Sequence, residues 1–166
     1  MLEARRYRAY LTPEQSERAA QWLGAQRFLW NLALEQRNTA RQVFGQSAHR
    51  FDQDKELKGL RAEVGWLKDV PQVAQQQLLA DLEQAFKNWW GGTHRRPTWR
   101  KRGQRQGMRF PAKECKDMTK LNRRWSSVRL PKLGTVKFRR DRPLGGGVRS
   151  VTLKADSVGD WFLIVL

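Results

Sequence analysis

The chain has 166 residues and a formal net charge of +17, from 33 lysines and arginines against 16 acidic residues. Such an excess attracts phosphate groups and makes binding steeply dependent on salt, so it indicates a nucleic-acid partner rather than the surface of an ordinary enzyme. Eight tryptophans and seven phenylalanines supply enough core material to argue against wholesale disorder, and the length suits one domain or two small ones.

Membrane association and disulfide chemistry are not expected. The sequence has no apolar run long enough to cross a bilayer and no signal-like stretch near Met1, so we expect a cytoplasmic location. The arginine-rich region lacks the periodicity of a basic amphipathic helix. A single cysteine, Cys115, allows neither an internal disulfide nor a Cys-x-x-Cys zinc motif.

The first elements have clear local signals. Residues 3–10 alternate between apolar and polar positions, which predicts a strand with one basic face. A helix is expected to begin directly afterwards, with Thr12 as its N-cap, Pro13 in its first position and Gln15 reaching back to the cap.

Helical spacing of apolar residues then continues to Phe44, interrupted by Gly24. Two structures fit this pattern: one bent helix, or a short helix followed by a turn and a second helix. A further helix is expected over residues 52–62, with Phe51 and residues 66–67 as its anchors.

The most strongly patterned helix begins at Pro71, and its apolar residues recur at helical spacing as far as Trp89. Gly91 and Gly92 then end it. Gln72, Gln75 and Gln76 lie in its first turns, where the helix dipole favours phosphate. Because glutamine can bond an adenine edge with two hydrogen bonds, we expect these side chains to read DNA bases; a merely polar helix surface is the alternative.

Residues 93–107 form a basic tether, and no acidic residue occurs between Glu83 and Glu114. Cations interleaved with aromatic rings suit a polyanion that also offers flat faces for stacking. The cations expected to neutralise phosphates are Arg95, Arg96, Arg100, Lys101, Arg102, Arg105 and, just beyond the tether, Arg109. Trp99 fits two roles equally, stacking on a base or packing into a core. A charge run that only solubilises the chain is the alternative for the whole tether.

Beyond the tether the pattern changes from helical to alternating and turn residues multiply, which predicts β-structure. The expected strands cover residues 108–111, 127–130, 135–138, 150–154 and 161–166. The last strand is apolar and runs to the end of the sequence, so we expect a truncated protein or a separately encoded fragment.

One strand before the helices and several after them predict an α+β fold, a β-barrel into which a helical bundle is inserted. The expected parts are the first barrel strand (1–11), a helical domain (12–92), the basic tether (93–107) and the remainder of the barrel (108–166). Arg27 and Asn31, one helical turn apart, are further candidates for contact with nucleic-acid backbone. A bond between these two side chains, or capping of a neighbouring helix, fits equally.

The sequence resembles the TnpB/OrfB proteins of insertion sequences. The segments that carry the resemblance follow the family's order along nearly the whole chain: RRYR and LTPEQ (5–8, 11–15), QRFLWN (26–31), WLKDVP (66–71), LEQAFKNWW (82–90), RPTWRKR (96–102) and LPKLGTVK (130–137). Each motif alone is weak, whereas their combination in this order is specific.

Members of this family are transposon-associated proteins that are similar to type V CRISPR effectors and act as RNA-guided DNA endonucleases. The resemblance implies that the barrel is a wedge domain and the helical insertion a recognition domain, which together bind a guide RNA and read a short motif beside the DNA target. It also implies that Lys132 and Lys137 lie on the RNA-facing side of the barrel, and that the host is bacterial or archaeal, with the protein near the nucleoid.

The family's metal-dependent RuvC-like nuclease domain and its zinc ribbon are expected to follow the point where this sequence stops. Phosphoryl-transfer nucleases need carboxylates that converge on divalent metals, whereas the acids here are scattered along helical patterns. His49, His94 and Cys115 lack the spacing of metal ligands. We therefore expect no catalytic residue, metal or other cofactor in this chain, and a divalent metal only in the missing nuclease domain.

The sequence thus predicts the nucleic-acid-binding lobe of a TnpB-like endonuclease, with guide RNA and duplex DNA as partners and a separate or missing C-terminal nuclease part. Whether this chain alone is an enzyme is left open, although an incomplete active site is expected. Two alternatives belong to other classes: a part of a longer, active nuclease, and a helix-turn-helix DNA-binding regulator built on residues 12–44.

Overall fold

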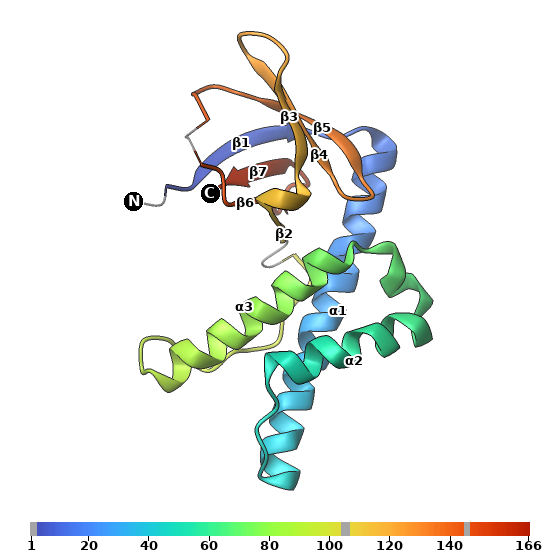
Figure 1. The fold of residues 1–166 in the computed structure, drawn as a ribbon, viewed down its shortest axis with the longest axis vertical. Helices are drawn as coiled ribbons and strands as arrows, with labels where there is room; N and C mark the ends of the chain where they lie inside the picture. Colours follow the sequence, from blue (N-terminus) through green and yellow to red (C-terminus); the bar gives the residue numbers. More distant parts are fainter. Residues whose placement is uncertain (1–2, 104–106, 145–146) are drawn as a thin grey trace. The chain divides into compact units, whose positions relative to one another are not determined.

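The computed structural model describes residues 3–103, 107–144 and 147–166. Two compact units are present, one formed by Met1–Leu23 with Gly103–Leu166 and the other by Gly24–Arg102. The first contains a β-sheet and the second contains helices, while one long helix contributes to both (Figure 1). The predicted α+β class, a barrel-like sheet interrupted by a helical insertion, is confirmed.

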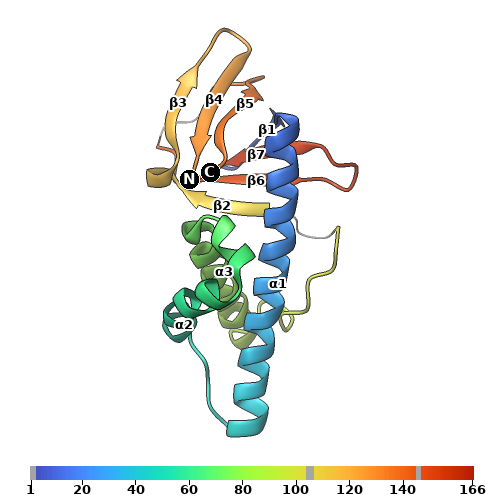
Figure 2. The ribbon, with the colours of Figure 1, turned by 90° about the vertical axis from the view of Figure 1, so that its right-hand side faces the viewer.

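Among the described residues, seven antiparallel strands make the sheet, in the order β2-β6-β7-β1-β5-β4-β3. The strands are β1 (Arg5–Tyr10), β2 (Gly107–Pro111), β3 (Lys116–Lys120), β4 (Trp125–Leu130), β5 (Gly134–Arg139), β6 (Ser150–Ala155) and β7 (Trp161–Val165). β1 lies at the centre, where Ala9 pairs with Phe138 of β5 and with Trp161 of β7. Figure 2 shows β3 and β4 at a steep angle to β2 and β6, so the sheet is strongly curled.

The curl follows from the order of the strands. The edge strands β2 and β3 are consecutive in sequence, joined only by the 3-10 turn η2 (Ala112–Glu114) and its neighbours. The five residue steps from Pro111 to Lys116 span at most about 18 Å. The two edges must therefore approach each other, which makes the sheet a half-barrel.

Alternation along the strands separates a buried face from a charged one. Tyr7 and Ala9 of β1 are buried, whereas Arg6 and Arg8 are exposed, as the sequence predicts. β3 is not predicted, because none of its residues is buried and it therefore lacks apolar alternation.

Helix α1 (Pro13–Phe44) is one continuous helix of 32 residues, and residues 12–44, all of which are described, contain no internal turn. The capping box is confirmed: the Gln15 N–H donates to Thr12 Oγ1 (3.2 Å) and the Thr12 N–H donates to Gln15 Oε1 (3.1 Å). Gly24 does not break the helix, because an interior glycine costs only about 1 kcal/mol relative to alanine. Gly45, at φ +63°, ends it.

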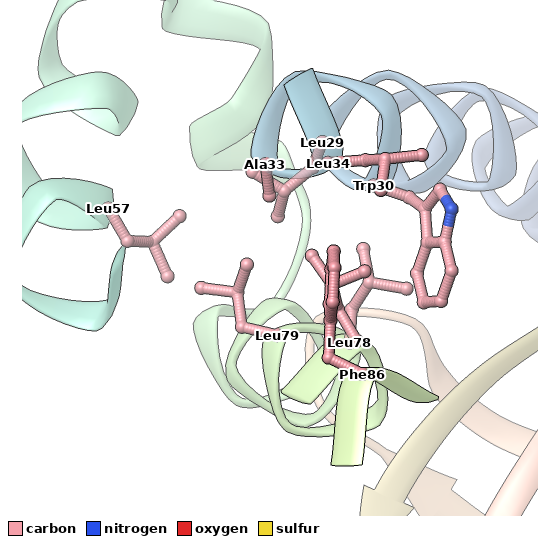
Figure 3. Close-up of a cluster of buried hydrophobic side chains, with 9 residues drawn as sticks. Leu29, Trp30, Ala33, Leu34, Leu57, Leu78, Leu79 and Phe86 are labelled. Atoms are coloured by element: carbon pink, nitrogen blue, oxygen red, sulfur yellow. The ribbon is translucent and has the colours of Figure 1, made fainter. Parts of the chain in front are cut away.

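The helical unit also contains α2 (Arg50–Glu63), the 3-10 helix η1 (Gly65–Asp69) and α3 (Gln72–Trp90). Figure 3 shows how apolar side chains from α1, α2 and α3, among them Ala33, Leu57 and Leu79, point toward one another to form its core. Leu67 is fully buried, as expected of an anchor, whereas Phe51 is 75% exposed and the prediction that it anchors α2 is wrong.

Candidate nucleic-acid interface

The part of the basic tether that belongs to the helical unit, residues 93–102, is held beside α1 through its main chain (Figure 2). The side-chain amide of Asn31 bonds both backbone groups of one tether residue: Nδ2 donates to the Arg100 carbonyl (3.1 Å), and the Arg100 N–H donates to Oδ1 (2.8 Å). The indole N–H of Trp30 donates to the Thr98 carbonyl (3.0 Å). Such bonds contribute about 0.5–1.5 kcal/mol each, so the tether has a defined path.

Two tether arginines also pack on aromatic rings. The Arg100 guanidinium lies 3.8 Å from the centroid of the Trp30 ring. Arg96 lies 5.4 Å from the ring of Trp89 on α3 and donates to Asn38 Oδ1 of α1 (2.9 Å). These contacts add cation–π attraction to the main-chain bonds and fix the tether at a third point.

Several tether side chains next to these contacts face solvent. Arg95, Lys101 and Arg102 are exposed, and Trp99 is 51% exposed. Packing into a core, one of the two roles open to Trp99, does not occur in this structure. The helical unit therefore presents a row of cations with an indole ring among them.

The geometry changes the role expected of Asn31. Its Oδ1 and one N–H of its Nδ2 are engaged by the Arg100 main chain, so the amide positions the tether. Contact of the second Nδ2 hydrogen with nucleic-acid backbone stays a prediction. Arg27 is half-buried on the same helix. The sequence did not indicate Trp30 or Asn38 as tether contacts, because no local pattern reports a partner 68 or 58 residues away.

The three glutamines of α3 separate into two groups. Gln75 is fully buried, donates from Nε2 to the Leu67 carbonyl (3.0 Å) and accepts from Arg61, so it cannot present its amide to a base in this structure. Gln72 is exposed and Gln76 half-buried, and both lie one helical turn apart on the same face. The prediction that this helix reads DNA bases is therefore limited to Gln72 and Gln76.

The remaining predicted residues belong to the sheet unit. Lys137 is exposed, with its ammonium 4.4 Å from the centroid of the Trp125 ring. Lys132 is exposed in the turn before β5, where its carbonyl accepts from Arg18 (2.9 Å), and Arg109 is half-buried in β2. Arg105 lies outside the described residues.

The described part of the chain contains no group of three or more His, Cys, Asp or Glu side chains that could hold a metal ion. Burial, together with the nearby Glu114 carboxylate, raises the pKa of the Cys115 thiol to about 11, so this thiol stays protonated at neutral pH and is a poor nucleophile. None of the described helices combines the length and apolar character needed to cross a membrane.

Comparison with known proteins gives matches along most of the chain. A family model described as a helix-turn-helix domain (OrfB, IS605) matches residues 1–46, which include β1 and α1. The "Putative RNA-guided DNA endonuclease InsQ" of Escherichia coli (strain K12) is 34% identical over 148 residues, which cover 86% of this chain and 34% of the E. coli protein. A Streptomyces pristinaespiralis protein with the name "Putative RNA-guided DNA endonuclease" is 26% identical over 172 residues, which cover 97% of this chain and 40% of its own length.

These matches define a class, the transposon-associated proteins that carry a helix-turn-helix DNA-binding domain. Within that class, the chain belongs to the TnpB/OrfB family. It spans between a third and two fifths of the length of the two relatives. The term helix-turn-helix is the name of the family model. In this chain the matched region contains one continuous helix, from Pro13 to Phe44.

Proposed function

We propose that this chain binds a guide RNA and target DNA as the recognition part of an RNA-guided DNA endonuclease. The observation that carries the proposal is the tether, whose exposed side chains Arg95, Trp99, Lys101 and Arg102 are displayed on a main chain fixed to α1. Guanidinium and ammonium groups neutralise phosphates, and an exposed indole offers a face on which any base can stack. Because the path of the tether is already set, less ordering entropy is lost when it binds.

The relatives support the same reading. Their names describe RNA-guided DNA endonucleases, and their length leaves room for a nuclease domain that this chain does not span. We assign cleavage, and the divalent metal that it requires, to that further part of a longer protein. The role of the present residues is then to hold and position nucleic acid.

The first test is the salt dependence of binding. Arg95, Lys101 and Arg102 should each contact phosphate, so replacing all three with Gln should reduce the slope of log K against log salt by about 2 to 3. The measurement is a titration of nuclease-treated protein with RNA transcribed from its own locus and with duplex DNA, across a salt series.

The control variant loses three positive charges from the helical unit outside the tether. Its substitutions replace three exposed lysines of α2 and α3 with Gln: Lys55, Lys58 and Lys87. This variant has the same net charge as the tether variant. An unchanged slope in the tether variant, or an equal change in both, would contradict the tether as the phosphate-binding site. Specific binding of duplex DNA without RNA would instead favour the alternative function, a helix-turn-helix DNA-binding regulator.

A second test concerns base reading by α3. Gln76→Ala should remove about 1–3 kcal/mol of discrimination at a single base pair of the DNA motif, because a bidentate contact to one base would be lost. Binding of the protein–RNA complex to a library of duplexes measures this. Gln84→Ala, on an exposed part of the same helix, is the control. A uniform loss of affinity over all sequences would show that Gln76 does not read a base.

A further inference from the structure

A cavity of about 650 Å³ lies within the helical unit, between the last turns of α1, the segment 45–49 and the last turns of α3. This volume falls within the range of about 300–1,000 Å³ that is typical of small-molecule sites. None of the described residues that line it is acidic, whereas three are arginines, Arg37, Arg41 and Arg96. The cavity is therefore suited to an anionic ligand.

Two tryptophans of α3 give the same cavity flat apolar walls. Trp89 and Trp90 both line it and are 36% and 55% exposed. Phe86, which is buried and also lines the cavity, supports both rings, with centroid separations of 6.2 Å to Trp89 and 5.7 Å to Trp90. Two large exposed rings on a supported wall provide a surface for stacking a planar ligand.

Arg37 places a buried guanidinium, whose charge is paired with Glu83, at the same place. The residue is only 5% exposed; its Nε donates to Gln53 Oε1 (3.0 Å) and its Nη2 to Glu83 Oε2 (3.1 Å). Its Nη1 has no hydrogen-bond acceptor among the described residues. A buried guanidinium donor without an acceptor is costly, so an acceptor supplied by a ligand or water would stabilise it.

We infer that this cavity binds one unpaired nucleotide, with its base stacked on Trp90 and its phosphate held by Arg41 and Arg96. Arg41 is exposed at the last turn of α1, and Arg96 is already held by Asn38 and the Trp89 ring. The inference rests on the proposed function only in that the ligand is a nucleic acid. It adds a site that accepts a nucleotide only outside a base-paired helix.

The test compares single-stranded with duplex binding by the full chain. Fluorescence anisotropy would follow the binding of a uridine 12-mer RNA, a thymidine 12-mer DNA and a blunt 12-base-pair duplex. Trp90→Ala should weaken single-strand binding about five- to tenfold, as expected for the loss of one stacked base, and leave duplex binding within about twofold. The single strand that loses more affinity, RNA or DNA, identifies the source of the nucleotide.

Matched variants separate the cavity from general charge and from folding. Arg41→Gln should reduce single-strand affinity more than Lys58→Gln, which removes the same charge from an exposed position on α2. Trp90→Leu keeps apolar contact with Phe86 but removes the flat ring, and Phe51→Ala removes a different exposed ring. Trp90→Leu should lower single-strand binding as Trp90→Ala does, whereas Phe51→Ala should not.

Equal losses for single strand and duplex in both Trp90 variants, no loss in either, or equal effects of Arg41→Gln and Lys58→Gln would overturn the inference. The cavity is tested by the ratio of single-strand affinity to duplex affinity, whereas the tether is tested by the slope of log K against log salt. Failure of the cavity and failure of the proposed function are therefore distinguishable.

Discussion

Glu83→Gln should lower the free energy of unfolding of the helical unit by about 3 kcal/mol, because it leaves a buried arginine without its counter-charge. Arg37 and Glu83 form an ion pair at 3.1 Å, with side chains that are 3% and 13% exposed. The Glu83 carboxylate also accepts the backbone N–H of Arg50 at the start of α2 (2.6 Å). Urea unfolding followed by hydrogen exchange of the α1–α3 amides measures the change.

The matched control is Glu35→Gln, the same substitution at an exposed position of α1, which should change stability by less than about 0.5 kcal/mol. Arg37→Met combined with Glu83→Leu should recover most of the loss, because no unpaired charge is then buried. A Glu83→Gln protein as stable as the Glu35→Gln protein would show that the pair does not contribute.

The same pair gives stability a dependence on pH. Burial raises the pKa of Glu83, but the hydrogen bonds from Arg37 and the Arg50 N–H, together with the charges of Arg37 and Lys87, outweigh it and hold the pKa below its usual value. A lowered folded-state pKa stabilises the fold above the unfolded value of about 4.3, and this contribution is lost as the pH falls through the folded-state value. The gap in stability between wild type and Glu83→Gln should therefore be constant near neutral pH and close under acid conditions.

Leu163→Ala should cost the sheet unit about 3 kcal/mol, within the range for deleting a buried leucine side chain. Leu163 is fully buried in β7, where it pairs with Tyr7 of β1 and Leu153 of β6, two further fully buried residues. Hydrogen exchange of the β1, β6 and β7 amides in urea measures the loss for this unit separately from the helices.

The adjacent residue is an unusually close control. Ile164 has the same number of carbon atoms but lies on the opposite face of β7 and is only half-buried. Ile164→Ala should therefore cost clearly less than Leu163→Ala. Equal costs would contradict the assignment of the two faces of the sheet.

Features with local causes are those that the sequence predicts best. The start of α1 follows from Thr12 and Gln15, which bond each other, and the end of α3 at Gly91 follows from two consecutive glycines. Strands β4 and β5 are predicted correctly because the turn at residues 131–134, which contains Pro131 and Gly134, separates two short alternating segments. A barrel-like sheet is predicted from the order of strands and helices, and the curled half-barrel confirms it.

Features that depend on distant partners are not predicted. Gln75 has the polar character of a surface residue, but η1 and Arg61 enclose it. One helix or two between Thr12 and Phe44 could not be decided, because a glycine that costs only about 1 kcal/mol is compatible with either structure. The cavity lined by Arg41, Trp90 and Arg96 combines three separate segments, so no local pattern in the sequence indicates it.

Because Asn31 holds the tether by its main chain, the path of the tether does not depend on which side chains the tether exposes. Asn31 recognises the peptide N–H and carbonyl at position 100, groups that every residue except proline provides. Substitutions at Arg95, Trp99, Lys101 and Arg102 therefore leave these anchoring bonds in place. Under the proposed function, these four side chains can therefore change, and with them the nucleic acid that is bound, with little effect on the helical scaffold that displays them.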